Sequence, residues 1–298
     1  MKKKKIVSLL MAALMIGQFL PSETMTAFAG ESALVGKEQL ADRHTVAPKK
    51  DSVVPNANQY EYQKQELAAF CHFGPNTFNE IEWGEKYGDK KPDEIFKLEE
   101  DFDADTFVEA IKEAGFEKLI VTAKHHDGFC MFDSKFTDFS IANGPFGTDP
   151  KKDVARHVFD AFRQKDFMIG CYFSKPDWHC EWFWNPYFAT ANRRQNYKKE
   201  NHPDWWKNYQ DFTYNQMDEL MTDYGNFDIL WLDGGWVTGD DVNLDKLLTK
   251  VRTSTQPGLI AVDRTIRGRN ENYQTPERSI PEMQLNNPWE SCITLSND

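Results

Sequence analysis

The segment Asp228-Ile-Leu-Trp-Leu-Asp-Gly-Gly-Trp236 is the part of the sequence that most clearly decides the fold. Its first half is a nearly continuous apolar run, which is typical of a strand buried on both faces in a parallel sheet. Polar and small residues follow where such a strand would end. We therefore predict that Asp233 lies at the carboxyl end of a buried strand, and that Gly234 and Gly235 let the backbone turn there.

Other short apolar runs resemble this one on either side of it, at residues 67–73, 118–124, 168–174, 259–263 and 291–295. Helical patterns lie between most of these runs, at residues 103–115, 153–165, 208–224 and from Asn243 onward. Strands that alternate with helices in this way indicate a parallel α/β architecture, in which the helices connect neighbouring strands.

Two parallel architectures compete, a doubly wound sheet and a (β/α)8 barrel. A doubly wound nucleotide-binding sheet carries a glycine-rich turn after its first strand, whereas the first run here ends in His72-Phe-Gly-Pro75. Polar and aromatic residues instead follow nearly every strand, as they do at the active face of a barrel. We predict an α/β fold of the (β/α)8-like (TIM) type. It is expected to be incomplete at its C-terminus, because the runs are fewer than the eight strands of a closed barrel.

The N-terminal residues predict export. Lys2 to Lys5 precede an apolar run at 6–20, and Ala27-Phe-Ala29 matches a signal-peptidase site. We expect a signal peptide at 1–29, a polar linker or arm at 30–60 and a partial catalytic barrel at 61–298. An uncleaved N-terminal anchor is the alternative. No later run has membrane-spanning length, so we expect a secreted or cell-surface protein with no stable membrane insertion after cleavage.

The composition narrows the choice of partners. A net charge of −12 argues against nucleic acid, because phosphate binding needs a basic face. Aromatic residues make up 14% of the chain and include nine tryptophans, which suits a cleft that stacks on sugar rings. The five cysteines are irregularly spaced and predict neither a disulfide framework nor a zinc site. No metal or cofactor is expected, and the sequence does not indicate an oligomeric state.

Two motifs carry the chemistry. Asp233 follows Trp231 by two residues on the same strand face, and a carboxylate beside indoles suits a glycosidase nucleophile. The alternative is that Asp233 only caps the next helix. In Lys124-His-His-Asp-Gly-Phe129, two adjacent histidines would point to opposite faces of a strand, so they bind one metal only if the strand has ended. We interpret His125 and His126 as ligand contacts, with a structural role as the alternative. Weaker candidates are His72, Glu82, Trp83 and Arg264.

In their order along the chain, these motifs resemble family 29 of the glycoside hydrolases, the α-L-fucosidases. The resemblance runs from about Glu66 to Asp298 and rests on His72-Phe-Gly with Glu82-Trp83, Thr122-Ala-Lys-His-His-Asp-Gly-Phe129 and Trp231-Leu-Asp-Gly-Gly235. It implies a (β/α)8-like barrel followed by a β-sandwich, and we expect residues 66–298 to correspond to part of the barrel alone. It also implies a retaining, exo-acting α-L-fucosidase whose substrates are fucosylated oligosaccharides or glycoconjugates, with Asp233 as nucleophile. The implied fucose contacts are His72, Trp83, His125, His126, Tyr172, Trp231 and Arg264.

Two glutamates match positions at which the family places its acid/base residue. Glu290 precedes the predicted strand 291–295, so it would start near the inactive face of the sheet. Glu277 lies in the loop that leaves the fifth strand and would reach the active face. We predict Glu277, with Glu290 as the alternative and Glu82 as a third candidate.

Two other functions fit parts of the sequence. A metal-dependent barrel hydrolase would use His72, His125, His126 and Asp233 as ligands. A non-catalytic glycan-binding protein, or an inactive truncated barrel, would follow if the open sheet failed to hold the two carboxylates in place.

Overall fold

The structure is a computed structural model of the 298-residue chain. It describes residues 14–15, 55, 57–84, 87–98, 102–145, 152–189, 192–265, 268–285 and 288–291. Most of the expected signal peptide (1–29) and linker (30–60) lies outside these ranges. So does the predicted strand 291–295 beyond Ser291, together with Cys292.

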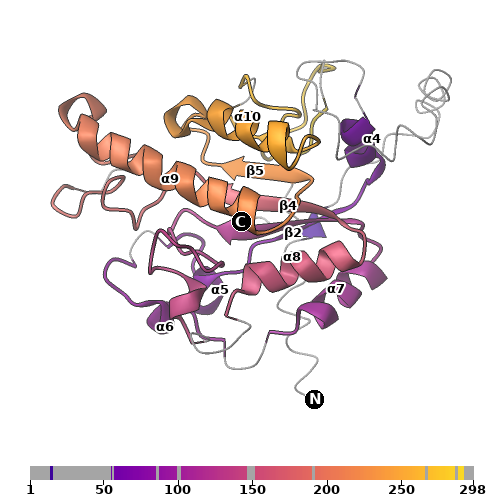
Figure 1. Ribbon diagram of the computed structural model, residues 1–298, viewed down its shortest axis with the longest axis horizontal. Helices are drawn as coiled ribbons and strands as arrows, with labels where there is room; N and C mark the ends of the chain where they lie inside the picture. The colour runs from indigo at the N-terminus through magenta and orange to yellow at the C-terminus, as the bar shows by residue number, and fades with distance from the viewer. Residues whose placement is uncertain are drawn as a thin grey trace.

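A single sheet forms the centre of the molecule, and its strands neighbour one another in chain order (Figure 1). The strands are β1 (Leu14–Met15), β2 (Ala68–Cys71), β3 (Lys118–Lys124), β4 (Met168–Ser174), β5 (Ile229–Asp233) and β6 (Ile260–Val262). β2 to β6 are parallel, and β1 pairs with β2 in the antiparallel sense. The predicted parallel α/β architecture is confirmed, and the bounds of β3 and β4 are those expected from the sequence.

Helices connect the parallel strands. α4 (Ala57–Lys64) precedes β2. The connecting helices are α5 (Pro75–Asn79), α6 (Pro92–Ile95), α7 (Ala104–Glu113), α8 (Val154–Gln164), α9 (Pro203–Asp223) and α10 (Leu244–Ser254), with 3-10 turns η2 (Ile141–Asn143), η3 (Lys199–Asn201) and η4 (Asp240–Val242). The carboxylates of Asp103 and Asp153 cap α7 and α8 by accepting from backbone N–H groups of the first turn. α9 begins earlier than expected, because Pro203 suits the first turn of a helix. α4 begins inside the range expected to be a linker.

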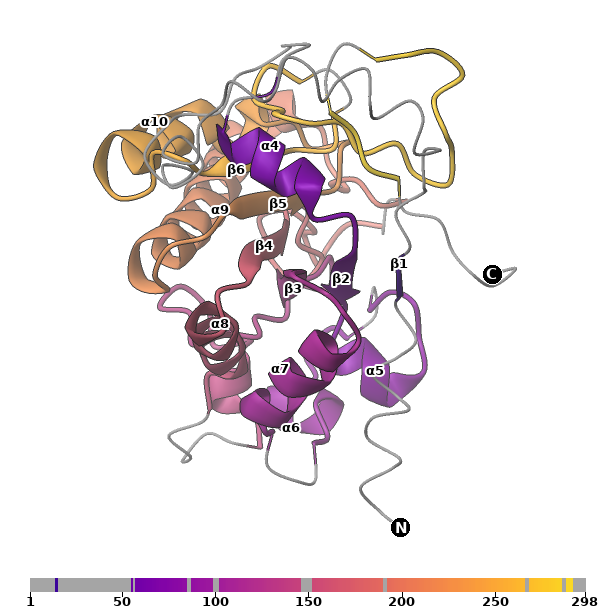
Figure 2. The same ribbon diagram turned by 90° about the vertical axis from the view of Figure 1, so that its right-hand side faces the viewer.

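The two faces of the sheet have different cores. The larger core lies between the strands and helices α7 to α10, which Figure 2 shows along one side of the curved sheet. The other face carries a smaller cluster of alternate strand residues, including Ile120, Tyr172 and Trp231. Tyr62 of α4 joins this cluster, and Asn58 of the same helix bonds to Gly258 O just before β6. α4 therefore covers the end of the sheet at which the strands start (Figure 1).

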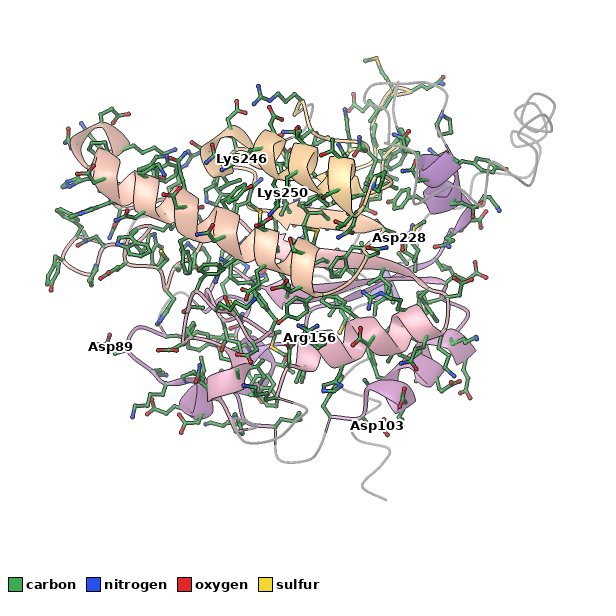
Figure 3. All side chains as sticks on the ribbon, in the orientation of Figure 1. Asp89, Asp103, Arg156, Asp228, Lys246 and Lys250 are labelled. Atoms are coloured by element: carbon green, nitrogen blue, oxygen red, sulfur yellow. The ribbon has the colours of Figure 1, made fainter. Side chains whose placement is uncertain are left out.

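The labelled side chains Lys246 and Lys250 belong to α10 and Arg156 to α8 (Figure 3). Lys250 of α10 pairs with Asp218 of α9 at 2.6 Å, and the Arg156 guanidinium of α8 stacks on the Tyr224 ring at 4.0 Å. No helix among the described residues is long and apolar enough to cross a membrane.

The described strands do not close into a barrel, in agreement with the predicted incomplete (β/α)8-like fold. β6 has a strand partner on one side only. On its other side Ala261 donates to the Asn272 side chain at 2.8 Å and accepts from the Asn272 N–H at 2.9 Å. Asn272 therefore satisfies part of the open edge in place of a further strand.

Candidate active site

Asp233 is the last residue of β5 and lies beside Ser174, the last residue of β4. Its carboxylate accepts the Tyr172 hydroxyl at 2.6 Å and the Gly234 N–H at 2.7 Å. The Arg264 Nε lies 3.2 Å from Oδ1, and the His126 Nε2 lies 3.7 Å from Oδ2. The exposed fraction of the Asp233 side chain is 18%. The carboxylate is thus fixed in place yet accessible at the carboxyl end of the strands.

These neighbours keep Asp233 ionised. Burial alone raises the pKa of the carboxyl group, but His126, Arg264, the Tyr172 hydroxyl and the Gly234 N–H together hold it well below its usual range. Burial also lowers the pKa of His126 to about 4, so that imidazole is neutral at neutral pH. The positive charge beside Asp233 under those conditions is therefore that of Arg264.

Hydrogen bonds assign the tautomer of His126. The Ser174 hydroxyl donates to Pro176 O at 2.6 Å, so its oxygen accepts from the His126 Nδ1–H, also at 2.6 Å. Nε2 of the neutral ring then carries a lone pair and faces the Asp233 carboxylate. Both atoms are then acceptors, and each can accept from a hydroxyl group of a bound ligand.

Stacked rings form one wall of the site. Tyr172 and Trp231 are register partners on β4 and β5, and their rings stack at 5.4 Å. His125 stacks on the other side of Tyr172 at 5.7 Å, and His72 meets both rings edge-on. The Thr122 hydroxyl fixes His72 by a 2.9 Å bond to Nδ1. β3 ends at Lys124, so His125 and His126 lie beyond the strand, with ring centres 4.6 Å apart.

A second group of rings lies behind His126. Trp178 and Trp236 lie 5.2 Å and 5.3 Å from the His126 ring, and Trp83 meets Trp178 edge-on at 6.3 Å. Among the described residues, the ring nitrogens Nδ1 of His125 and Nε1 of Trp178 and Trp236 are buried without a hydrogen-bond partner. Buried polar groups are normally bonded, so these atoms are suited to a polar ligand.

Arg264 forms ion pairs with Asp233 and Glu277, the predicted nucleophile and the predicted acid/base residue. It has a left-handed backbone conformation with φ 59°, and its guanidinium pairs with both Asp233 and Glu277. The Glu277 side chain is more than half exposed. Glu277 therefore lies at the carboxyl end of the sheet, one guanidinium away from Asp233.

Glu290 lies elsewhere. Its carboxylate accepts the Trp231 Nε1–H at 2.7 Å and the Tyr62 hydroxyl of α4. Lys118, the first residue of β3, donates to Tyr62 O at 3.2 Å, which places this group toward the start of the strands. The Glu290 carboxylate thus binds the indole N–H of Trp231 on the side of α4. Its hydrogen-bond partners are Trp231 and Tyr62, not the neighbours of Asp233.

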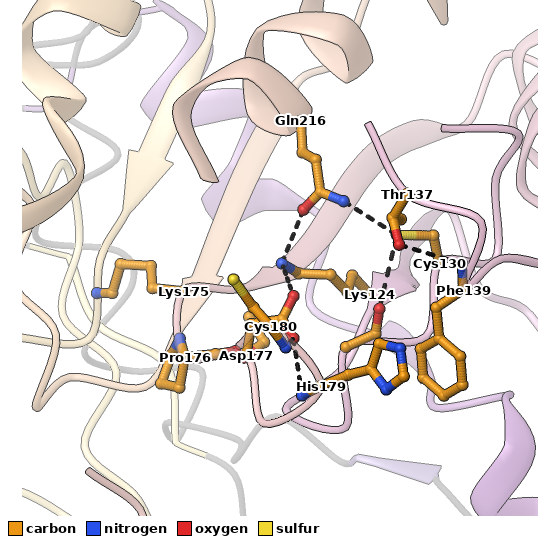
Figure 4. Close-up of polar contacts among 12 residues, drawn as sticks. Lys124, Cys130, Thr137, Phe139, Lys175, Pro176, Asp177, His179, Cys180 and Gln216 are labelled. Atoms are coloured by element: carbon orange, nitrogen blue, oxygen red, sulfur yellow. Dashed lines mark hydrogen bonds and ion pairs between the residues drawn. The ribbon is translucent and has the colours of Figure 1, made fainter. Parts of the chain in front are cut away.

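A buried ion pair supports the loops that carry the site (Figure 4). Lys124 Nζ bonds to Asp177 Oδ2 and to Gln216 of α9, each at 2.9 Å. The other Asp177 oxygen accepts the N–H groups of His179 and Cys180. The turn fixed in this way contains Trp178, whose backbone N–H donates to the backbone oxygen of His126 at 2.9 Å. Lys124, Ser174 and Asp177 were not predicted as site residues. The only sequence signals for them are the position of Lys124 next to the histidines and the positions of Ser174 and Asp177 at or just after a strand end.

Glu82 does not join the other predicted site residues. It is exposed, and its backbone oxygen accepts from Asn76. In the described part of the chain, no group of three or more His, Cys, Asp or Glu side chains is arranged to hold a metal ion. The described cysteines Cys71, Cys130, Cys171 and Cys180 are all free.

Comparisons with known proteins converge on one family. The family model for α-L-fucosidase matches residues 33–298. A curated relative, α-L-fucosidase 1 of Arabidopsis thaliana, is 34% identical over 187 residues, which cover 63% of this chain and 32% of the relative.

Two solved structures are similar in sequence and fold. One is a GH29 fucosidase of Ruminococcus gnavus, a mutant in complex with fucose, with 41% identity and a TM-score of 0.50; the match covers 63% of this chain and 37% of that one. The other is a putative α-L-fucosidase of Bacteroides ovatus, with 30% identity and a TM-score of 0.55; the match covers 74% of this chain and 34% of that one. The chain spans about a third of the length of these relatives.

Proposed function

Because the chain belongs to the α-L-fucosidase family, we propose that it is a retaining, exo-acting glycoside hydrolase that releases terminal α-L-fucose. The observation that carries this proposal is the ionised Asp233 carboxylate, which is held by Tyr172, Gly234 and Arg264 at the exposed end of β5. A nucleophile of this kind must be deprotonated and fixed, yet open to the sugar.

The proposed reaction is a double displacement. Asp233 attacks the anomeric carbon of fucose, while an acid protonates the departing glycosidic oxygen. The resulting fucosyl-enzyme is then hydrolysed by water, which the same residue activates as a base. Glu277 is the proposed acid/base, because Arg264 connects it to Asp233 and because its side chain is exposed to solvent and to an incoming leaving group.

Glu290 is better suited to holding Trp231. Both of its oxygens accept hydrogen bonds from aromatic residues, Trp231 and Tyr62, so they are occupied in the folded protein. A proton donor for a leaving group needs a free oxygen at the carboxyl end of the strands, where Asp233 lies.

The polar and apolar parts of the site suit a 6-deoxy sugar. The lone pair of His126 Nε2 and the unpartnered ring nitrogens of His125, Trp178 and Trp236 can bond to hydroxyl groups. The stacked rings of Tyr172 and Trp231 offer an apolar surface for ring carbons and the methyl group. We infer that the substrates are fucosylated oligosaccharides or glycoconjugates, as the family membership suggests.

The central test uses Asp233→Gly and 4-nitrophenyl α-L-fucoside. The wild-type chain should hydrolyse this substrate, and the variant should lose turnover because it cannot form the covalent intermediate. Azide should restore turnover of the variant and yield β-L-fucosyl azide, because a small anion can occupy the space of the lost carboxylate. Unchanged activity in the variant would remove Asp233 from this role.

The same assay separates the competing functions. A chain that is folded and binds fucose but turns over no fucoside would be a glycan-binding protein. Loss of turnover on treatment with a chelator, restored by a divalent metal, would instead favour a metal-dependent hydrolase.

We also propose that residues 1–29 direct export. The lysines at 2–5, the apolar run and the Ala27-Phe-Ala29 site support this proposal. Expression of the full gene should yield a secreted or cell-surface protein whose first residue is Gly30. Retention of the intact N-terminus in the membrane fraction would favour an anchor.

A further inference from the structure

Lys175 is a fully buried lysine that the proposed reaction does not use directly. It follows Ser174, the last residue of β4, and Figure 4 labels it next to Pro176. Burial lowers the pKa of its ammonium group to about 8, so the group is still charged at neutral pH. Burying a charge costs free energy unless partners satisfy it, so the contacts of Lys175 need a reason.

Three polar groups of Lys175 bond to three different elements. Its Nζ donates to the backbone oxygen of Asp263, just after β6. Its backbone N–H donates to Asp233 O at 3.2 Å, and its backbone oxygen accepts the Tyr209 hydroxyl of α9 at 2.7 Å. Lys175 therefore connects the ends of β5 and β6, the two strands that carry the proposed nucleophile and Arg264.

The bond to Asp263 fixes an unusual turn. The next residue, Arg264, has a left-handed backbone, which is uncommon for a residue other than glycine and persists only where the surroundings impose it. Gly235 packs against the next carbonyl group of this turn, because a Cβ atom there would lie 2.3 Å from Arg264 O. Lys175 and Gly235 thus contact two successive backbone oxygens of the turn from which the guanidinium reaches Asp233 and Glu277.

We propose that Lys175 is a positioning residue, whose ammonium group fixes the Asp263–Arg264 turn and thereby aligns Glu277 with Asp233. This inference rests on the proposed function. It assigns to Lys175 an effect on proton donation to the leaving group, transmitted through Arg264, rather than any contact with the sugar. A purely structural lysine would affect the amount of folded protein but not the dependence on the leaving group.

The test compares two substrates that differ in their need for an acid, 4-nitrophenyl α-L-fucoside and methyl α-L-fucoside. Lys175→Met removes the ammonium but keeps an unbranched side chain. Its kcat/KM should fall about tenfold or more further for the methyl glycoside than for the aryl glycoside. The informative quantity is the ratio of kcat/KM for the aryl glycoside to kcat/KM for the methyl glycoside. This ratio does not depend on the fraction of folded molecules, so a loss of stability alone cannot change it.

Two further variants complete the design. Lys118→Met also removes a buried ammonium that bonds to a backbone oxygen, but at the start of β3, and its substrate ratio should stay that of the wild type. Gly235→Ala displaces the same turn through a clash with Arg264 O, without removing a charge, and should raise the ratio as Lys175→Met does. If Lys175→Met does not fold, the substrate ratio of Gly235→Ala still tests the role of the turn.

An unchanged ratio in Lys175→Met and Gly235→Ala would overturn the inference, as would an equal rise in Lys118→Met. The proposed function would stand in either case, provided that the wild type hydrolyses the aryl fucoside. If the wild type hydrolyses neither substrate, both proposals fall.

Discussion

At the scale of single residues, the state of Asp233 depends on side chains from other strands. Tyr172 comes from β4, Arg264 from the turn after β6 and His126 from the loop after β3. Each belongs to a different strand end, so the contacts that orient the carboxylate and keep it ionised despite its burial form only when these ends lie together. Electrostatic arrangement of this kind is what lowers the barrier in many enzymes.

The Tyr172 hydroxyl gives the first prediction. Tyr172→Phe removes the 2.6 Å bond to the ionised form of Asp233, so the pKa of that carboxyl should rise. The acidic limb of the kcat/KM profile with 4-nitrophenyl α-L-fucoside should move to higher pH, and kcat/KM at neutral pH should fall about tenfold.

A matched control is available at Tyr224, whose hydroxyl bonds to the Asp153 carboxylate at the same distance, 2.6 Å, away from the site. Tyr224→Phe should lower stability by a similar amount and leave the pH profile in place. A profile that shifts equally in both variants would contradict a specific effect of Tyr172 on Asp233.

The two glutamates give the second prediction. Glu277→Ala should depress hydrolysis of poor leaving groups far more than that of activated aryl fucosides, because the latter need little protonation. Glu290→Ala should show no such dependence. It should instead raise KM and lower stability, because Trp231 Nε1 and the Tyr62 hydroxyl lose their shared partner.

Steady-state kinetics with a series of aryl fucosides of graded leaving-group pKa distinguishes the two variants. A steep dependence in Glu290→Ala together with a flat one in Glu277→Ala would reverse the assignment.

At the scale of elements, the loops after β3 and β4 form one unit held by Lys124 and Asp177. Gly128 is the residue that lets them meet. Its φ is +85°, and a Cβ atom at this position would lie 2.3 Å from Asp177 Oδ1. The Asp177 carboxylate, which pairs with Lys124, and the Cβ of His179 are therefore packed directly against a glycine.

Gly128→Ala should therefore lower the free energy of unfolding by roughly 3 kcal/mol, since backbone strain and a clash add together. Gly115→Ala is the matched control, because its φ is +87° but its surroundings are open. That variant should cost only about 1 kcal/mol from strain. Urea unfolding of both variants measures the difference, and equal losses would show that the contact with Asp177 is unimportant.

At the scale of the whole molecule, the sheet is open at β6, and Asn272 covers part of its edge. The Asn272 Oδ1 accepts from Ala261 and from Arg252, and the Asn272 backbone oxygen accepts from Gln59 of α4. A single residue thus connects the last strand, α10 and the helix that covers the start of the sheet. Unpaired strand edges favour association with other chains, so this residue should affect solubility as well as stability.

Asn272→Ala should leave the buried Ala261 N–H and part of Arg252 without an acceptor, at a cost of about 2 kcal/mol. It should also increase the fraction of oligomers seen by light scattering. Asn143→Ala, which removes an exposed side-chain bond to Asp138 O, is the control and should do neither. A variant that stays monodisperse with wild-type stability would show that the edge is protected in another way.

The sequence alone determined the order of the parallel strands and of α7 to α10, because apolar runs and the helical spacing of apolar residues are local signals. β3, β4 and the starts of α7 and α8 follow directly from them. It also placed Asp233, His125 and His126 at strand ends, since the apolar run before each motif shows where the strand stops. α4 was not anticipated, because its polar residues make their bonds to distant parts of the chain.

Only the tertiary structure decided which strand-end side chains meet. The contact of Tyr172 with Asp233 follows from the register of β4 on β5, and the contact of Arg264 with both carboxylates follows from a left-handed turn after β6. The separation of Glu290 from Asp233, the buried Lys124–Asp177 pair and the role of Lys175 likewise join residues that lie far apart in the chain. Local sequence patterns encode an element and where it ends. Hydrogen bonds between the ends depend on how the elements pack, and that packing is a property of the whole fold.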